Sequence, residues 1–72
     1  MKFLTDRQVE VFDFIKGFIK RNGYPPAVRE IALNFGFSAK AAYDHLISLE
    51  RKGCVKRKPE TARSIQVINI GV

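Results

Sequence analysis

The centre of the chain constrains the fold most, because two helical patterns lie there with only residues 36–38 between them. Before this break, apolar residues recur at the i, i+3, i+4, i+7 spacing of one helix face: Val28, Ile31, Ala32 and Phe35. Gly36 can end that helix, and Ser38 can cap the next one, which starts at Ala39. Two helices joined by so short a turn predict a helix-turn-helix.

The helix that starts at Ala39 has two distinct faces. One face is expected to pack against the other helices and carries Ala42, His45, Leu46 and Leu49. The opposite face is mostly polar and carries Lys40, Tyr43, Asp44, Ile47 and Arg51. Gly53 is expected to end this helix.

A longer helix is predicted before this pair, over about residues 6 to 22. Thr5 and Gln8 match the capping box, in which each side chain accepts a hydrogen bond from the other residue's backbone. Gly23 and the two prolines after it end the pattern. The helix that begins near Val28 has a poorer start, because Ala27 has no side-chain acceptor.

Beyond Gly53 the apolar spacing changes from helical to alternating. Residues 54–58 and 64–68 form two β-prone runs, separated by the turn-like residues 59–63. This pattern predicts an antiparallel hairpin, the wing. The sequence therefore predicts an α+β fold, a three-helix winged helix-turn-helix with a C-terminal two-stranded β-hairpin wing.

Length and charge limit the possible functions. A chain of 72 residues allows one domain, over 1–72. Thirteen Lys and Arg against seven Asp and Glu give a net charge of +6, which favours nucleic acid as a partner before an anionic membrane surface. No apolar run approaches the roughly 18 residues of a membrane span, so we expect a soluble protein.

Nothing in the sequence indicates catalysis. It contains no phosphate-binding glycine loop and no recognisable Ser/His/Asp arrangement, so we expect no enzymatic activity, metal or cofactor. The single cysteine, Cys54, excludes an internal disulfide framework and fits a reducing cytoplasm. We expect Cys54 to be a small buried residue and His45 to be a packing residue.

The polar face of the helix from Ala39 is the predicted DNA-reading surface. Lys40 could donate to guanine, Asp44 could accept from cytosine, and Ala41 could contact a thymine methyl. Tyr43 could stack or hydrogen-bond. An ordinary solvated helix face is the alternative, but the outward Ile47 argues against it.

A basic cluster beside this helix is predicted to contact phosphates. It comprises Arg51 and Lys52 at the helix end, Lys56, Arg57 and Lys58 in the hairpin, and Arg63 at the end of the loop, where an Arg could enter a minor groove. Edge strands also carry Lys and Arg to discourage aggregation, which is the alternative for Lys56 and Lys58.

Four segments resemble the N-terminal DNA-binding domain of the LexA family of bacterial SOS repressors. They read LTxRQxEVxDxI at 4–15, GYPPxVREIA at 23–32, FGF at 35–37 and HLxxLxRKG at 45–53. The resemblance runs nearly from end to end. It implies a transcriptional repressor of DNA-damage genes that acts in the bacterial cytoplasm, at the nucleoid. It also implies a palindromic operator bound by a homodimer.

The resemblance also assigns roles to individual residues. Base contacts carry over to the start of the helix from Ala39, at Ser38, Lys40, Ala41, Tyr43 and Asp44. Backbone and minor-groove contacts carry over to Arg7, Lys52 and Arg63. The stretch between Gly36 and His45 is one residue shorter than is usual in the family, so the operator sequence does not carry over.

Full-length members of the family continue into a hinge and a Ser/Lys self-cleaving domain, whereas this chain ends at Val72. Because the family places its main dimer contacts in that domain, we expect the present chain to be a monomer in solution and a dimer on DNA. A winged-helix protein-interaction module without sequence-specific DNA binding is the alternative function.

Overall fold

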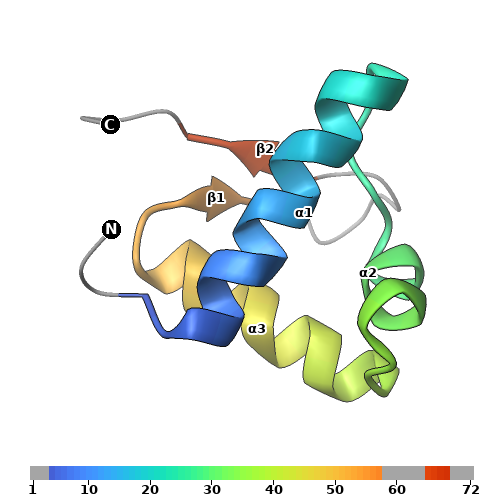
Figure 1. Cartoon of the computed structure of the whole chain (residues 1–72). Coiled ribbons are helices and arrows are strands. Elements are labelled where there is room, and N and C mark those ends of the chain that lie inside the picture. The colour runs from blue at the N-terminus through green and yellow to red at the C-terminus, as the bar shows by residue number, and fades with distance from the viewer. Residues whose placement is uncertain (1–3, 58–64, 69–72) are drawn as a thin grey trace.

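The computed structural model describes residues 4–57 and 65–68 of the chain. Three helices come first: α1 (Asp6–Asn22), α2 (Val28–Phe35) and α3 (Ala39–Arg51). The strands β1 (Val55–Lys56) and β2 (Gln66–Val67) follow them (Figure 1). This order confirms the predicted α+β winged helix-turn-helix. The loop predicted at 59–63 lies outside the described residues.

Short-range hydrogen bonds set both ends of α1. Thr5 Oγ1 accepts from the Gln8 backbone N–H at 3.1 Å, and Gln8 Oε1 accepts from the Thr5 N–H at 3.0 Å. The predicted capping box is therefore confirmed. At the other end Gly23 has φ +80°, and its N–H donates to the Ile19 carbonyl. A side chain would be strained at this φ, so glycine is what lets α1 end here.

A turn of three residues connects α2 to α3, as the sequence predicts. The N–H groups of Gly36 and Phe37 both donate to the Ala32 carbonyl, which closes the end of α2. Ser38 Oγ accepts from the Ala41 N–H at 3.1 Å and caps α3. Figure 1 shows the two helices leaving this turn in different directions, with α3 crossing below α1.

The hydrophobic core lies between the three helices. The side of α3 predicted to face inward is buried, since Ala42, Leu46 and Leu49 expose none of their surface. They pack with side chains of the other two helices, including Val11, Ile15 and Ile31. Each large aliphatic side chain buried in this way contributes about 1.5–3 kcal/mol. This packing fixes the rotation of α3 about its axis.

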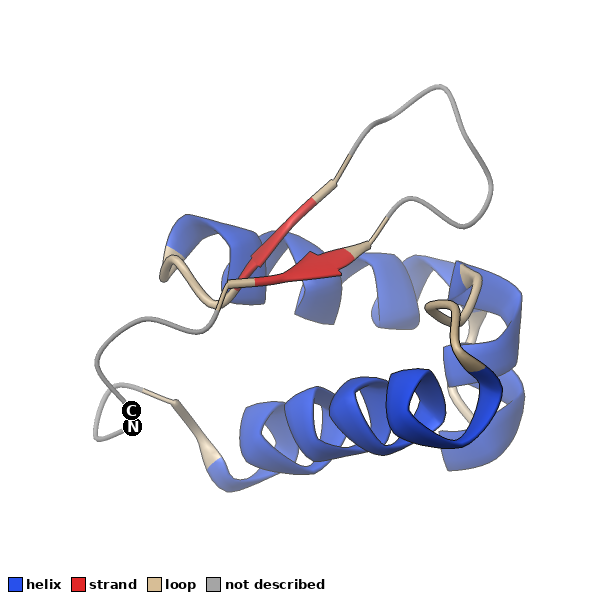
Figure 2. Cartoon of the chain, turned by 90° about the horizontal axis from the view of Figure 1, so that it is seen from above, coloured by secondary structure: helices blue, strands red, loops and turns tan. Residues whose placement is uncertain are grey.

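The wing closes one side of the core. Val55 pairs with Val67 and Lys56 with Gln66 in an antiparallel register, and the Ile68 N–H donates to the Cys54 carbonyl at 2.9 Å. Figure 2 shows the two strands lying over α3 in this view, with α1 on the opposite side of the picture. Within the described residues the strands are shorter than the predicted runs 54–58 and 64–68.

The chain enters β1 late for a local reason. The Cys54 N–H donates to the Leu49 carbonyl at 2.9 Å, so this residue still belongs to the turn that leaves α3. Gly53 makes that turn possible with φ +81°. Cys54 is a free, buried cysteine, as predicted.

The start of α2 generates a prediction about stability. Ala27 has the extended backbone of an N-cap, with φ −79° and ψ 162°, but its methyl group cannot accept a hydrogen bond. Glu30 Oε1 already accepts from the Ala27 N–H at 2.8 Å, which is half of a capping box. Ala27→Ser would supply the other half and is expected to stabilise the domain by about 0.5–2 kcal/mol.

Thermal unfolding measures this effect, because about 1 kcal/mol raises the Tm of a small domain by roughly 4–8 °C. Ala27→Thr and Ala27→Val form an isosteric control pair, of which only Thr should gain from the hydroxyl. Equal melting temperatures for Thr and Val would show that the cap is not formed.

Candidate nucleic-acid interface

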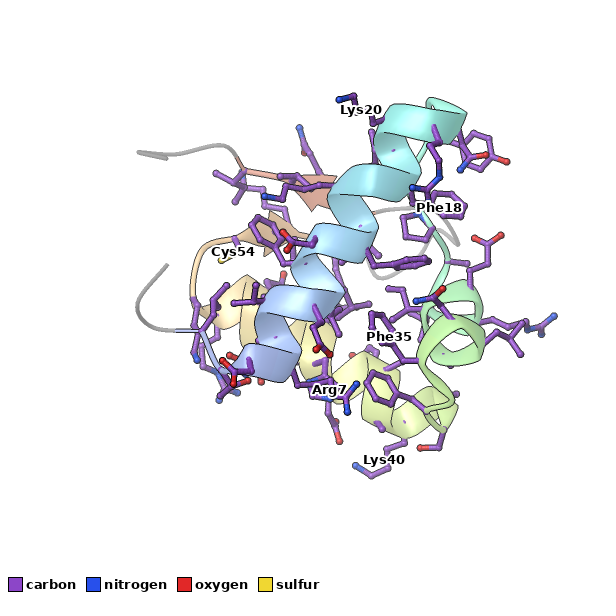
Figure 3. All side chains as sticks on the ribbon, viewed as in Figure 1. Arg7, Phe18, Lys20, Phe35, Lys40 and Cys54 are labelled. Carbon is purple, nitrogen blue, oxygen red and sulfur yellow. The ribbon has the colours of Figure 1, made fainter. Side chains whose placement is uncertain are left out.

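The outward side of α3 presents Lys40 and Asp44 to solvent. Their side chains are 84% and 59% exposed, and Lys40 Nζ lies 3.2 Å from Asp44 Oδ2. Lys40 projects away from the body of the domain (Figure 3). An exposed ion pair of this kind contributes little to stability, so a ligand can separate the two charges at low cost.

The order of these two charges is unfavourable for the helix itself. Lys40 lies in the first turn of α3, next to the positive end of the helix dipole, and no acidic residue lies in that turn. The acidic partner at i+4 follows the lysine, which is the weaker of the two orientations. The stability of α3 therefore does not explain why Lys40 occurs here.

Ser38 and Ala41 are the other predicted base contacts in the first turn. Both take part in the N-cap of α3, because the Ser38 hydroxyl accepts from the Ala41 N–H. Ser38 is exposed and Ala41 is half-buried. Of the two, Ser38 has the more accessible side chain, while Ala41 offers a small methyl group close to the backbone.

Tyr43 lies on the same outward side and is 43% exposed. The guanidinium carbon of Arg57 lies 4.8 Å from the centre of the Tyr43 ring. The sequence did not predict this contact. Arg57 Nε also donates to Glu50 Oε1 at 3.2 Å. The side chain of Arg57, one of the predicted phosphate contacts, therefore lies against α3.

Arg7 and Lys52 lie near the start of α1. The Arg7 guanidinium carbon is 5.4 Å from the centre of the Phe37 ring, in the turn before α3, and its Nη1 lies 3.1 Å from Glu10 Oε1. Phe37 stacks in turn on His45, with ring centres 4.9 Å apart, which confirms His45 as a packing residue. Figure 3 shows Arg7 toward the same end of the domain as Lys40, with Lys20 at the opposite end of α1.

Gln8 is a connecting residue whose full role the sequence did not indicate. It is 9% exposed, and its Oε1 accepts from Lys52 Nζ at 2.8 Å as well as from the Thr5 N–H. The capping box predicted the local bond. The bond to Lys52 joins residues 44 positions apart, and no local pattern signals it.

The remaining predicted phosphate contacts are cationic and come late in the chain. Arg51, in the last turn of α3, and Lys56, in β1, are exposed. Lys58 and Arg63 lie outside the described residues. Within residues 51–63 the sequence has six Lys and Arg but only one acidic residue, Glu60, so this segment carries much of the net charge of +6.

Metal-binding clusters and membrane-spanning helices are not found in the described part of the chain. Residues 4–57 and 65–68 contain no group of three or more His, Cys, Asp or Glu side chains placed to hold a metal ion. No helix in these ranges is long and apolar enough to cross a membrane.

Comparison with known proteins agrees with this geometry. Residues 1–64 match the model of the LexA DNA binding domain. The chain belongs to the LexA DNA-binding domain family. Proteins named LexA repressor from Thermosipho melanesiensis, Leptospira interrogans and Thermotoga maritima are 46%, 48% and 49% identical to it, over 94%, 94% and 93% of its length.

The LexA relatives are longer than this chain. The aligned region covers 34% of each of these three proteins, so the chain spans about a third of their length. Membership of the LexA DNA-binding domain family agrees with the helix-turn-helix, the wing and the exposed cations Arg51 and Lys56 described above.

The interface generates a second prediction about stability, which separates residues that hold the fold from residues that face a ligand. Gln8→Ala removes the acceptor of two hydrogen bonds and is expected to lower the free energy of unfolding by about 1–3 kcal/mol. Lys40→Ala removes an exposed charge that the dipole of α3 disfavours. This variant is expected to leave the free energy of unfolding unchanged within about 0.5 kcal/mol.

Urea unfolding of the free domain measures both effects. Gln8→Glu is the control for the first variant, because it keeps an oxygen acceptor opposite Lys52 and should retain most of the stability. A large loss of stability in Lys40→Ala would instead assign that side chain a structural role.

Proposed function

We propose that this domain binds double-stranded operator DNA in a sequence-specific manner as part of a transcriptional repressor of the SOS type. The observation that carries the proposal is the outward side of α3, where Lys40 and Asp44 offer a donor and an acceptor that the fold does not require. A DNA major groove about 12 Å wide admits one helix, and the first turns of such a helix contact base edges.

The basic residues supply the second part of the mechanism. Arg7 lies against the turn before α3, whereas Arg51 and Lys56 are exposed at the far end of α3 and in the wing. Cations at both margins of a helix in the groove would contact the phosphates that border it. Phosphate contacts then provide affinity and salt dependence, while α3 provides the choice of sequence.

The assembly on DNA is the third part of the proposal. We propose that two copies bind a palindromic operator and that the domain alone is a monomer in solution. Among the described residues, the large exposed apolar side chains come from separate segments: Tyr24 before α2, Leu33 in α2 and Tyr43 in α3. Scattered apolar residues of this kind are normal on a monomer. This function would place the protein in the cytoplasm, at the nucleoid.

Variants of the two classes should separate specificity from affinity. Lys40→Ala and Asp44→Ala are expected to cost roughly 1–3 kcal/mol on the preferred operator and to relax base choice. Lys56→Ala is expected to weaken binding to specific and random duplexes alike, and to reduce the slope of log affinity against log salt by about 0.9. The same even loss is expected for Arg63→Ala.

Lys56 serves better here than Lys52, because Lys52 also donates to Gln8 and its loss would combine a charge effect with a loss of stability. Fluorescence anisotropy titrations at several salt concentrations give both quantities. If Lys40→Ala weakened both duplexes equally, Lys40 would be a phosphate contact. If the wild-type domain bound no duplex at low salt, the protein-interaction module would be the better explanation.

A further inference from the structure

The side chain of Arg57 connects the wing to the outward side of α3. It follows β1 directly, yet it is only 15% exposed. Its Nε donates to Glu50 Oε1 at 3.2 Å, and its Nη2 donates to Tyr43 Oη at 3.4 Å. The guanidinium thus contacts an acidic and an aromatic residue of the same helix.

These two partners lie on one stripe of α3. Tyr43 and Glu50 are seven positions apart, which is close to two helical turns, and the half-buried Ile47 lies between them. Arg57 reaches both partners from the wing. Glu50 compensates the charge of the guanidinium and holds it against α3. A guanidinium that bound phosphate alone would not need this acidic partner.

Tyr43 combines a contact to Arg57 with an exposed surface. Its ring has the Arg57 guanidinium at 4.8 Å, while 43% of the residue remains exposed. A side chain that is already ordered loses less freedom when it binds, and the saving corresponds to about two- to tenfold in affinity for one side chain.

We propose that Arg57 is a positioning residue that fixes the ring of Tyr43 for base contact, with Glu50 holding Arg57 in place. This inference rests on the proposed function, because Tyr43 must face DNA for its position to matter. It changes the role expected for Arg57 from phosphate binding to control of sequence choice, and it couples the wing to the helix that reads bases.

The test compares Arg57→Met with Lys56→Met, a neighbouring wing cation that is exposed. Methionine keeps an apolar stem of similar length, so the packing of the wing is retained. The readouts are the specificity ratio, which is the affinity for a duplex selected from a random pool divided by that for a random duplex, and the salt slope. Arg57→Met should lower the ratio by about two- to tenfold and leave the slope unchanged.

Lys56→Met should show the reverse, with the slope reduced by about 0.9 and the ratio unchanged. An Arg57→Met variant that behaves like Lys56→Met would overturn the proposal and make Arg57 a phosphate contact. A double-mutant cycle adds a second criterion, since Arg57→Met should have no further effect on the ratio when Tyr43→Ala is present. An equal loss in both backgrounds would also overturn it.

A measurement without DNA separates this inference from the proposed function. The chain has two tyrosines and no tryptophan, so Tyr24→Phe leaves Tyr43 as the single tyrosine fluorophore. In that background Arg57→Met should increase quenching of Tyr43 by acrylamide, and Lys56→Met should not. Unchanged quenching would show that Arg57 does not hold the ring. A wild-type domain that does not distinguish the two duplexes would overturn the proposed function and, with it, the role of Tyr43 in base choice.

Discussion

The packing of α3 against α1 and α2 decides what this domain can present to a partner. Ala42, Leu46 and Leu49 expose none of their surface, and this burial fixes the rotation of the helix. Lys40, Tyr43 and Asp44 must then face solvent, because they occupy the opposite side of the same helix. A rotation of α3 would bury charges without partners and expose apolar surface, both of which are costly.

Side-chain bonds between distant segments complete this arrangement. The bond from Lys52 to Gln8 ties the end of α3 to the start of α1, and the contacts of Arg57 tie the wing to the middle of α3. Both bonds involve cations that sequence patterns assign to phosphate binding. The basic residues thus include some that have partners within the fold, such as Arg57, and some that are exposed, such as Lys56.

Local signals in the sequence predicted most of the fold. The helix bounds follow from short-range features, such as the Thr5 and Gln8 capping box and the glycines at 23 and 36. The hydrogen bonds of these caps join residues only three or four positions apart. The burial pattern of α3 follows from its apolar spacing. The environment of Arg57 could not be predicted in this way, because its partners lie 7 and 14 positions away and depend on the angle of the wing.

The most direct test of sequence-specific binding by α3 is selection of bound duplexes from a random pool by the wild-type domain, alongside the Lys40→Ala variant. The proposed function predicts that the wild-type domain enriches one motif, present as two inverted half-sites, and that Lys40→Ala loses preference at some positions of each half-site while still retaining DNA. Recovery of duplexes without any common motif would contradict the claim that the outward side of α3 reads sequence.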